Sequence, residues 1–319
     1  MNQPFVVTYS ILVYAYLYIG TEVTLLEANH CPGAVMFLFK IPVIEQTMLH
    51  CGDFRACPAM EEYPSLWNNR IDKLYLDTTY CQPEYDFPSQ EDAILSAIEL
   101  IHQHIAAYPK TLLICGTYTI GKLPRQYISL RKLEKHYTYL PAQAYNIHVV
   151  FLSGKERVFL AIAQEFDCKI WAKPDKMKIL RALEDNQLLD RLTNSPNNAQ
   201  IHLMEMEKVR NFKFPVEYLE DFSSQYNHIL SIIPTGWTHQ KGSTSESSLQ
   251  NMKIKIFKDN TSRLEIPYSE HSSFSELKRF VKFLKLHSPS SVVPTVNIGN
   301  PKSRNNMVNL FKNWVAEST

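Results

Sequence analysis

None of the six cysteines in this 319-residue sequence forms a CxxC pair with another. Their spacing therefore gives no sign of a zinc ribbon or of a disulfide scaffold. Cysteines that are neither paired nor clustered are typical of a reducing compartment, so the sequence predicts an intracellular protein. The length suits one large or two modest domains, and a hydrophobic content of 45% is enough for a substantial core.

The sequence also lacks an excess of one charge and a targeting signal. Its net charge is +1, so any attraction to nucleic acid must come from a local patch. The apolar run 5–20 has no Lys or Arg before it and therefore lacks the basic region of a signal peptide. This run is short for a membrane span and contains Thr8 and Ser10, whereas its β-branched and aromatic residues favour a buried strand. We therefore expect no membrane association.

Short runs rich in β-branched residues alternate with amphipathic helices, which predicts an α/β layered fold. The expected strands are 23–26, 35–39, 47–50, 73–76, 111–115, 229–233 and 291–296. One helix begins at Ser89, with acidic residues in its first turn, and ends at the proline that follows Tyr108. Further helices are expected from about Ser275, from Glu156 and at the C-terminus. The Ser-rich segment 240–252 is expected to be a mobile loop.

The segment 123–155 differs in character from the rest of the chain. It has no glycine before Gly154, and it contains four tyrosines. Two Gly-Lys dipeptides bracket it, Gly121-Lys122 and Gly154-Lys155. Removing 123–155 joins TYTIGK directly to ERVFLAIAQ, which reads as a turn followed by a regular helix. We therefore expect this segment to be foreign to the fold.

Three polar residues follow expected strands, where a loop can direct a side chain into a site. His30 stands in ANHCPG, and an imidazole there could bind zinc, although a single histidine is more often structural. Asp53 comes after a glycine that allows close backbone approach, and the alternative is an aspartate that caps a turn. Asp77 follows 73–76, at the edge where open α/β sheets gather their sites. It could orient a catalytic histidine, or it could equally cap the next turn.

A second group of polar residues precedes and lines the helix expected from about Ser275. His271 is followed by Ser272 and Ser273, whose hydroxyls could bind phosphate at a helix N-terminus or act as an ordinary N-cap. One face of this helix is basic, with Lys278, Arg279, Lys282 and Lys285. Two Gly/Thr loops, 116–122 and 234–238, could also hold phosphate oxygens. Neither matches a P-loop, so the sequence does not support the use of nucleoside triphosphates.

The order of these motifs resembles that of the metallo-β-lactamase/β-CASP nucleases of DNA cross-link repair. The strings that carry the resemblance are ANHCPGAV, GDFRACP, LYLDTTYCQPEYDFPSQ, GTYTIGK, PTGWTH, PYSEHSS and PTVNIG. It covers 22–122 and 156 to the C-terminus, and it implies the α/β fold of a metallo-β-lactamase αββα sandwich with an inserted β-CASP domain. The implied domains are a first metallo-β-lactamase part at 1–108, the β-CASP domain at 109–249, and a second metallo-β-lactamase part with the C-terminal helix at 250–319.

The resemblance also implies roles for individual residues. His30 and Asp53 match metal-binding motifs of the family and are implied to bind zinc. Asp77 and His271 match the β-CASP acidic and histidine motifs, so His271 is implied to act at the scissile phosphate with Asp77 in support. Val296 stands where DNA-processing members have valine and RNA-processing members have histidine. The expected contacts to phosphate and DNA are Thr119, Lys122, Ser272, Ser273, Lys278 and Lys282.

Taken as a whole, the resemblance implies a nuclear, zinc-dependent 5′-to-3′ exodeoxyribonuclease of interstrand cross-link repair. Its implied substrate is damaged DNA with 5′-phosphorylated ends. The family's first metal motif, HxHxDH, lies upstream of ANHCPG and does not occur anywhere in this sequence. We therefore expect the sandwich to be incomplete at its N-terminal side and the chain as given to be weakly active or inactive. Two alternatives are an inactive fragment with a DNA-binding or scaffold role, and an RNA-processing β-CASP nuclease.

Overall fold

The computed structural model describes residues 20–117, 154–236 and 245–317. The chain forms two compact units, each assembled from separate stretches of sequence. The first unit takes the residues up to Ala97, then Thr235–Met252 and everything from Ile266 onward. The second unit takes Ile98–Pro234 and Lys253–Glu265. The expected domain boundaries at 108/109 and 249/250 stay a prediction about functional domains.

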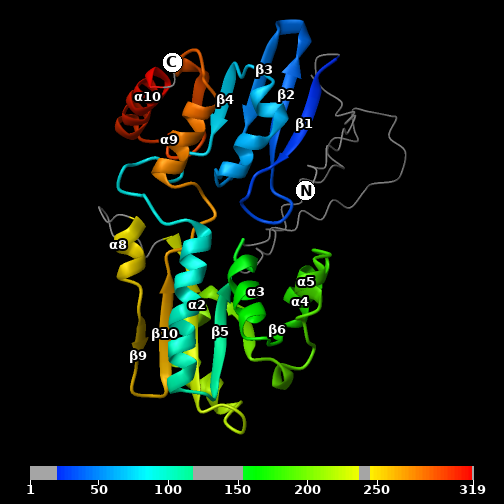
Figure 1. The fold of residues 1–319 in the computed structure, drawn as a ribbon, viewed down its shortest axis with the longest axis vertical. Helices are drawn as coiled ribbons and strands as arrows, with labels where there is room; N and C mark the ends of the chain where they lie inside the picture. The colour runs from blue at the N-terminus through cyan, green and yellow to red at the C-terminus, as the bar shows by residue number, and fades with distance from the viewer. Residues whose placement is uncertain (1–19, 118–153, 237–244, 318–319) are drawn as a thin grey trace, which may run out of the picture. The chain divides into compact units, whose positions relative to one another are not determined.

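The first unit contains a five-stranded sheet with the strand order β1-β2-β3-β4-β11 (Figure 1). β1 pairs antiparallel with β2 and β2 antiparallel with β3, while β3, β4 and β11 pair parallel. The bounds are β1 Glu22–Glu27, β2 Val35–Ile41, β3 Gln46–His50, β4 Lys73–Leu76 and β11 Val292–Pro294. The helices that lie wholly in this unit are α1 Pro64–Trp67, α8 Ser245–Gln250, α9 Phe274–Phe283 and α10 Pro301–Ala316. Within β1–β4 no two consecutive residues are buried, as expected where strand side chains alternate between two faces.

One face of this sheet carries the core of the unit. The buried strand residues are Leu26, Met36, Leu38, Leu49, Leu74 and Leu76, and they share one cluster with Leu277, Phe280, Phe311 and Trp314 of α9 and α10. The two helices also contact each other. The opposite face is only partly covered within the described residues, and the side chain of Phe37 is 36% exposed there. The apolar stripe that predicted α9 and α10 is thus the face with which both helices pack on one side of the sheet.

The second unit is built on a six-stranded sheet with the strand order β6-β7-β5-β8-β10-β9. β6, β7, β5 and β8 run parallel, and β10 pairs antiparallel with β9. The strand bounds are β5 Thr111–Thr117, β6 Ile170–Ala172, β7 Ile201–Glu205, β8 His228–Pro234, β9 Ile254–Ile256 and β10 Thr261–Ile266. Every residue of β5 and β8 is buried, as expected of central strands in a sheet covered on both faces.

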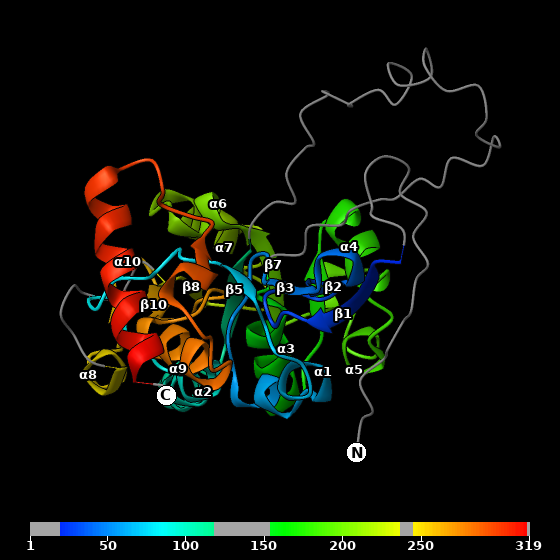
Figure 2. The ribbon, with the colours of Figure 1, turned by 90° about the horizontal axis from the view of Figure 1, so that it is seen from above.

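Helices of the second unit pack on this sheet. Their bounds are α3 Glu156–Glu165, α4 Pro174–Arg181, α5 Asn186–Leu189, α6 Met206–Arg210 and α7 Lys213–Glu220, and most of α2 Gln90–Ala107 also belongs here. α6 contacts β5, β8 and α7, and α7 contacts β8, so both helices cover the same part of the sheet (Figure 2). Met206 and Val209 are buried there against Leu112 and Ile233.

The structure confirms the mixed α/β fold and every expected strand, with small differences at the strand ends. It also confirms helices at Gln90–Ala107, Glu156–Glu165, Phe274–Phe283 and near the C-terminus. The loop expected over 240–252 is wrong in part, because Ser245–Gln250 forms the short helix α8. The apolar run 5–20 lies almost wholly outside the described residues. Within the described ranges no helix is both long and apolar enough to cross a membrane.

Deleting 123–155 is expected to leave the fold intact. The segment falls outside the described residues apart from Gly154 and Lys155, and the Gly-Lys-Glu sequence at 154–156 is restored when Lys122 joins Glu156. The charges of Lys155 and Glu156 act on the buried Cys115 of β5, so the start of α3 lies close to the end of β5. A short connection can therefore close this gap. Thermal melting of the deletion variant should match or exceed the full chain, and failure to fold would contradict the expectation.

Acid is expected to destabilise the second unit through buried histidines. His104 is 5% exposed, its Nε2 has no hydrogen-bond partner in the described structure, and its ring lies 5.0 Å from that of His228. Burial, with the charge of His228 as a smaller cause, lowers the pKa of His104 to about 4. The unfolded chain therefore protonates His104 near pH 6.5, whereas the folded unit keeps it neutral until the pH approaches 4. The contribution of neutral His104 to the free energy of unfolding is present above pH 6.5 and is lost as the pH falls below it.

Between pH 7 and pH 5 this loss should amount to about 1–2 kcal/mol for His104. Urea unfolding at the two pH values measures it. The variant His104→Gln should reduce the pH dependence, whereas His287→Gln, at an exposed histidine of the first unit, should not change it. Equal pH dependence in all three proteins would rule out this origin.

Candidate metal and catalytic site

Four strands of the first unit end at the same edge of its sheet. β1 and β3 are both antiparallel to β2 and so run in one direction, and β4 and β11 run parallel to β3. Their C-terminal ends lead into the loops that carry His30, Asp53, Asp77 and Val296. The topology alone therefore brings the four positions to one edge, where α/β sheets place their sites.

Backbone geometry fixes the loops after β1 and β3. Asn29 has a positive φ of 53°, and its side-chain amide donates to the carbonyl oxygen of Arg55 at 3.1 Å. The amide of Arg55 in turn donates to the carbonyl of Ala28 at 3.0 Å. Gly52 has φ 59°, a conformation that favours glycine, and its amide donates to His50 Nδ1 at 3.0 Å. The two loops are thus tied together, and Asp53 is exposed at their edge.

The carboxylate of Asp77 is 3% exposed and has four donors around it. Oδ1 accepts from the amide and hydroxyl of Thr79 at 3.0 and 2.6 Å. Oδ2 accepts from His271 Nδ1 at 2.7 Å and from the amide of Phe54 at 3.4 Å. Burial by itself would raise the pKa of Asp77, but the hydrogen bond and charge of His271 and the donors of Thr79 outweigh it and lower this pKa. Asp77 is therefore an ionised residue whose lone pairs are engaged by the protein.

His271 is held by this carboxylate. Burial opposes its protonation, but the hydrogen bond and charge of Asp77, with the charges of Asp53 and Glu270, outweigh burial and raise the pKa of His271. Because Nδ1 donates to Asp77, Nε2 is left to face a ligand. The ring centroid of His30 lies 4.7 Å from that of His271. His30 bonds the carbonyl of Glu270 through Nδ1 at 3.1 Å, which leaves its Nε2 available as well.

Asp53, Asp77 and His271 form a group that could hold a metal ion, since one ligand atom of each lies within 4.8 Å of those of the other two. Of these, Asp77 already accepts four hydrogen bonds, so Asp53 and His271 are the freer donors. His30 is not in this group but adjoins it through the ring of His271. The set offers imidazole nitrogen and carboxylate oxygen, the donors that suit zinc among other divalent ions.

The remaining expected contacts are placed as follows. Ser272 is buried, and its hydroxyl donates to the carbonyl of Phe54 and accepts from the amide of Ala56, at 3.2 and 2.9 Å. Ser273 is the N-cap of α9 and forms a capping box with Glu276. Both hydroxyls thus already have protein partners, and their contact with phosphate stays a prediction. Lys278 and Lys282 both pair with Glu317, at 3.0 and 3.2 Å. Thr119 and Lys122 lie outside the described residues.

Val296 belongs to the same edge of the sheet through its backbone. The hydroxyl of Thr78 donates to the carbonyl of Val296 at 2.7 Å, and the amide of Val296 lies 3.1 Å from that hydroxyl. Thr78 is the neighbour of Asp77 in sequence. Val296, whose role as a marker of the substrate class stays a prediction, is therefore bonded to the residue that follows the buried carboxylate of Asp77.

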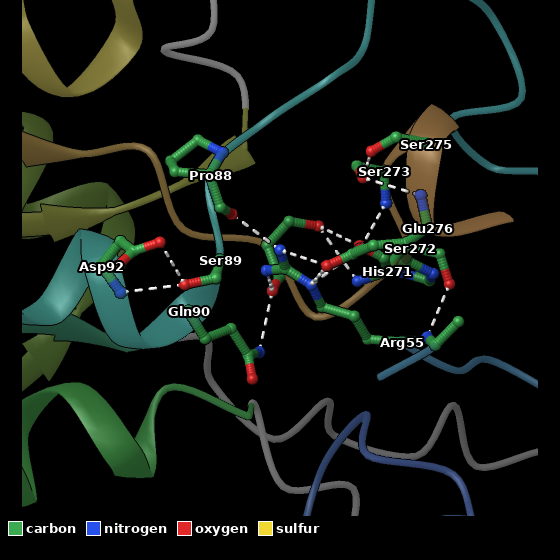
Figure 3. A network of polar contacts seen from close by, with 12 residues as sticks. Arg55, Pro88, Ser89, Gln90, Asp92, His271, Ser272, Ser273, Ser275 and Glu276 are labelled. Carbon is green, nitrogen blue, oxygen red and sulfur yellow. Dashed lines mark hydrogen bonds and ion pairs between the residues drawn. The ribbon is translucent and has the colours of Figure 1, made fainter. Parts of the chain in front are cut away.

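A buried arginine, which the sequence reasoning missed, holds the loops of this site together (Figure 3). Arg55 is 2% exposed, and its guanidinium donates to the carbonyls of Ser269 at 2.8 Å and Pro88 at 2.7 Å. It also meets both carboxylate oxygens of Glu276 at 3.0–3.2 Å. The string GDFRACP contains Arg55, but no local pattern in this string indicates that Arg55 bonds Glu276, which lies 221 residues later.

Comparisons with known proteins identify relatives of this chain by sequence. A family model described as "DNA repair metallo-beta-lactamase" matches residues 186–300. The chain is 39% identical to the DNA cross-link repair 1A protein of Gallus gallus over 301 residues, and 39% identical to that of Homo sapiens over 299 residues. These alignments cover 94% of this chain and 26% and 25% of those proteins, so the chain spans about a quarter of their length.

A relative with a different name extends the comparison. The chain is 32% identical to 5′ exonuclease Apollo of Gallus gallus over 283 residues, which covers 87% of this chain and 46% of that protein. The resemblance read from the motif strings is thereby confirmed. This chain belongs to the DNA repair metallo-β-lactamase family, which includes the DNA cross-link repair proteins.

Proposed function

We propose that this chain is part of a metal-dependent DNA nuclease of interstrand cross-link repair that removes nucleotides from 5′-phosphorylated ends, in the 5′-to-3′ direction and in the nucleus. The observation that carries the proposal is the buried ion pair of Asp77 and His271 beside the exposed carboxylate of Asp53. A carboxylate–histidine pair next to a further anionic donor suits phosphodiester hydrolysis better than a purely structural role.

The donor set fits a divalent metal, and zinc is the ion we propose. His30 and Asp53 would hold it, with the Nε2 of His271 close by. When bound, such an ion supplies a hydroxide nucleophile from coordinated water and neutralises charge on the phosphate. HxHxDH is absent from the 319 residues, so few donors remain and affinity should be weak.

The residues of the chain have separate tasks in this proposal. Asp77 fixes the ring and the tautomer of His271, because its Oδ2 accepts a hydrogen bond from Nδ1. Asp77 also raises the pKa of His271, which favours the doubly protonated ring, and the second proton, on Nε2, passes to the oxygen that leaves the scissile phosphate. Lys278 and Lys282 on the exposed face of α9 contact the DNA backbone and exchange Glu317 for phosphate when they do so.

The proposal is tested by assaying residues 1–319 beside a version that carries a family HxHxDH segment upstream. Both are given a 5′-phosphorylated DNA strand and zinc, and released nucleotides and bound zinc are measured. We expect weak or no cleavage by 1–319 and robust 5′-to-3′ digestion by the extended protein. DNA binding without digestion in both would favour a scaffold role instead, and digestion from the 3′ end would contradict the proposed polarity.

Val296 is expected to mark DNA as the substrate of the extended protein. The backbone of Val296 bonds Thr78, the neighbour of Asp77, and an apolar residue at this position offers no imidazole to a metal, as a histidine would. Matched DNA and RNA strands of one sequence should therefore be cleaved at clearly different rates, with DNA faster. Comparable rates on the two strands would favour the RNA-processing alternative.

A further inference from the structure

The second unit presents an exposed aromatic pair on the edge of its sheet. Phe212, between α6 and α7, is 63% exposed, and Phe257, directly after β9, is 36% exposed. Their ring centroids are 5.7 Å apart with an interplanar angle of 80°. Large apolar side chains are rarely left in water on a soluble surface as a contiguous group without a partner.

An arginine beneath this pair holds it in place. The guanidinium carbon of Arg263 lies 4.0 Å from the centroid of the Phe212 ring, which is a close cation–π contact. Arg263 is itself 9% exposed and is anchored by a hydrogen bond of 2.8 Å to the carbonyl of Arg210. The Phe212 ring is thus fixed from one face by a buried cation, while most of its surface remains open to solvent. A ring fixed in this way is a pre-organised surface for stacking.

The surroundings of the pair are basic. β9 and its flanks read KIKIFK over 253–258. Lys255 pairs with Arg263 in the register of β9 and β10 and so shares its face of the sheet, while Lys253 and Phe257 directly flank the strand. The stretches 210–213 and 253–265 together contain six basic residues and two acidic ones, although the whole chain has a net charge of only +1. Lys255 pairs with Glu265 at 3.7 Å, and the other acidic residue is Asp259.

Lysines on an edge strand also have an ordinary explanation, since they prevent edge-to-edge association of sheets. β9 is an edge strand of its sheet, so this explanation covers the lysines. It does not cover Phe212, which lies in a loop outside the sheet and whose exposed ring adds to the risk of association. Aromatic rings interleaved with cations are what proteins use to bind single-stranded nucleic acid, through base stacking and backbone attraction.

We propose that Phe212 and Phe257, with the cations of 210–213 and 253–265, form a stacking site for the bases of single-stranded DNA. This site lies in the second unit and uses none of the residues of the metal site. Bases stack on the open surface of Phe212, and the exposed Lys255 of β9 and Lys253 before it follow the phosphates.

The test is fluorescence anisotropy of a labelled oligothymidylate with residues 1–319 at low salt, in a chelator that prevents cleavage. Phe212→Ala is expected to weaken binding about tenfold, the size typical of one stacked base. The informative pair is Phe212→Trp and Phe212→Leu. Tryptophan should bind at least as tightly as phenylalanine, whereas leucine, which keeps an apolar side chain without a ring, should be as weak as alanine.

A second probe with the same phosphates but no bases separates stacking from charge. On this abasic strand the Phe212 variants should bind as the unchanged chain does, while Lys255→Gln should weaken both probes and flatten the salt dependence. Trp67→Ala, at a 61% exposed aromatic of the first unit, is the matched control and should have no effect. The proposal is overturned if leucine at 212 binds like phenylalanine, if Phe212→Ala weakens the abasic probe equally, or if the chain binds neither probe.

Melting temperatures of the variants show whether packing on Arg263 has been lost. If Phe212→Ala lowers the melting temperature, the comparison of Trp with Leu still decides, because both keep a large apolar side chain on the guanidinium. Binding is measured without metal, so a negative result leaves the proposed nuclease activity standing. An inactive metal site likewise leaves this binding site standing.

Discussion

Replacing Arg55 by methionine is expected to lower the free energy of unfolding of the first unit by about 3–5 kcal/mol. The guanidinium is 2% exposed and joins three segments that are distant in sequence, through the carbonyls of Pro88 and Ser269 and the carboxylate of Glu276. Methionine fills much of the volume of arginine but has no N–H group to donate these hydrogen bonds and no charge to pair with Glu276. It leaves Glu276 at 17% exposure without its counter-ion and removes the guanidinium donor from the carbonyl of Pro88, while the carbonyl of Ser269 keeps only the donor Nε2 of Gln90.

Two further variants separate charge from geometry. Arg55→Lys keeps the positive charge but cannot reach all three acceptors from one nitrogen, so an intermediate loss is expected. Glu276→Gln can keep the hydrogen bond to the amide of Ser273 and should cost less than Arg55→Met. Arg70→Met is the matched control, because Arg70 pairs with Asp72 while 75% exposed, and its change should stay within about 0.5 kcal/mol.

Urea unfolding of these variants at neutral pH measures the differences. A loss below about 1 kcal/mol for Arg55→Met, similar to Arg70→Met, would show that the buried network adds little to stability. A full loss of folding would leave Arg55→Lys and Glu276→Gln to rank the contributions. Because Ser269 lies two residues before His271, the same arginine also positions the loop of this histidine.

The sequence was sufficient for seven of the eleven described strands, β1–β5, β8 and β11, and for the four positions at the edge of the first sheet, whereas β6, β7, β9 and β10 were not predicted. β4 was predicted with both ends correct because apolar residues alternate over Lys73–Leu76 and an aspartate follows. His30, Asp53 and Asp77 could be placed at strand ends for the same local reason. Their convergence required the direction of β1, β3 and β4, which no local pattern gives.

Long-range hydrogen bonds explain what the sequence could not show. Ser272 reads locally as a phosphate ligand at a helix N-terminus, but its hydroxyl bonds Phe54 and Ala56, more than 200 residues earlier. β10 was missed because Thr261–Ile266 carries Ser262 and Arg263 at positions that are buried. Their partners, His228 for Ser262 and the carbonyl of Arg210 for Arg263, come from other elements. A strand whose buried positions hold polar residues, each bonded to a distant partner, cannot be predicted from the periodicity of apolar residues.

Asp77→Asn is expected to weaken zinc binding to residues 1–319 by about 10- to 100-fold, although in this proposal Asp77 is not itself the main donor. At present each carboxylate oxygen receives donors only, two from Thr79 on Oδ1 and those of His271 and Phe54 on Oδ2. An amide has one oxygen and one NH2 group, so one of these two pairs must face a donor instead of an acceptor.

The preferred orientation of the introduced amide keeps its oxygen toward Thr79, whose amide and hydroxyl donate at 3.0 and 2.6 Å, because one of the two donors on the other oxygen, the amide of Phe54, is as far as 3.4 Å. The NH2 group then faces His271 Nδ1. Nδ1 must therefore accept a hydrogen bond, and the neutral ring must carry its proton on Nε2. Nε2 is the nitrogen left for a metal, so a proton placed there by the exchange of tautomer removes the lone pair that would bind the ion. The substitution changes almost no volume, and its effect on the site therefore exceeds its effect on packing.

Two measurements distinguish this mechanism from simple damage to the fold. Nitrogen NMR of the histidine ring should report a proton on Nε2 of His271 in Asp77→Asn and on Nδ1 in the unchanged chain. Asp53→Asn, at an exposed residue, should weaken zinc binding while leaving the tautomer and the melting temperature unchanged. In the protein extended by HxHxDH, Asp77→Asn should also reduce the cleavage rate by about 100-fold or more, the range of a lost acid–base group. If zinc affinity and tautomer both stay unchanged in Asp77→Asn, the pair of Asp77 and His271 does not orient the site, and Asp77 serves only to close the loop at the end of β4.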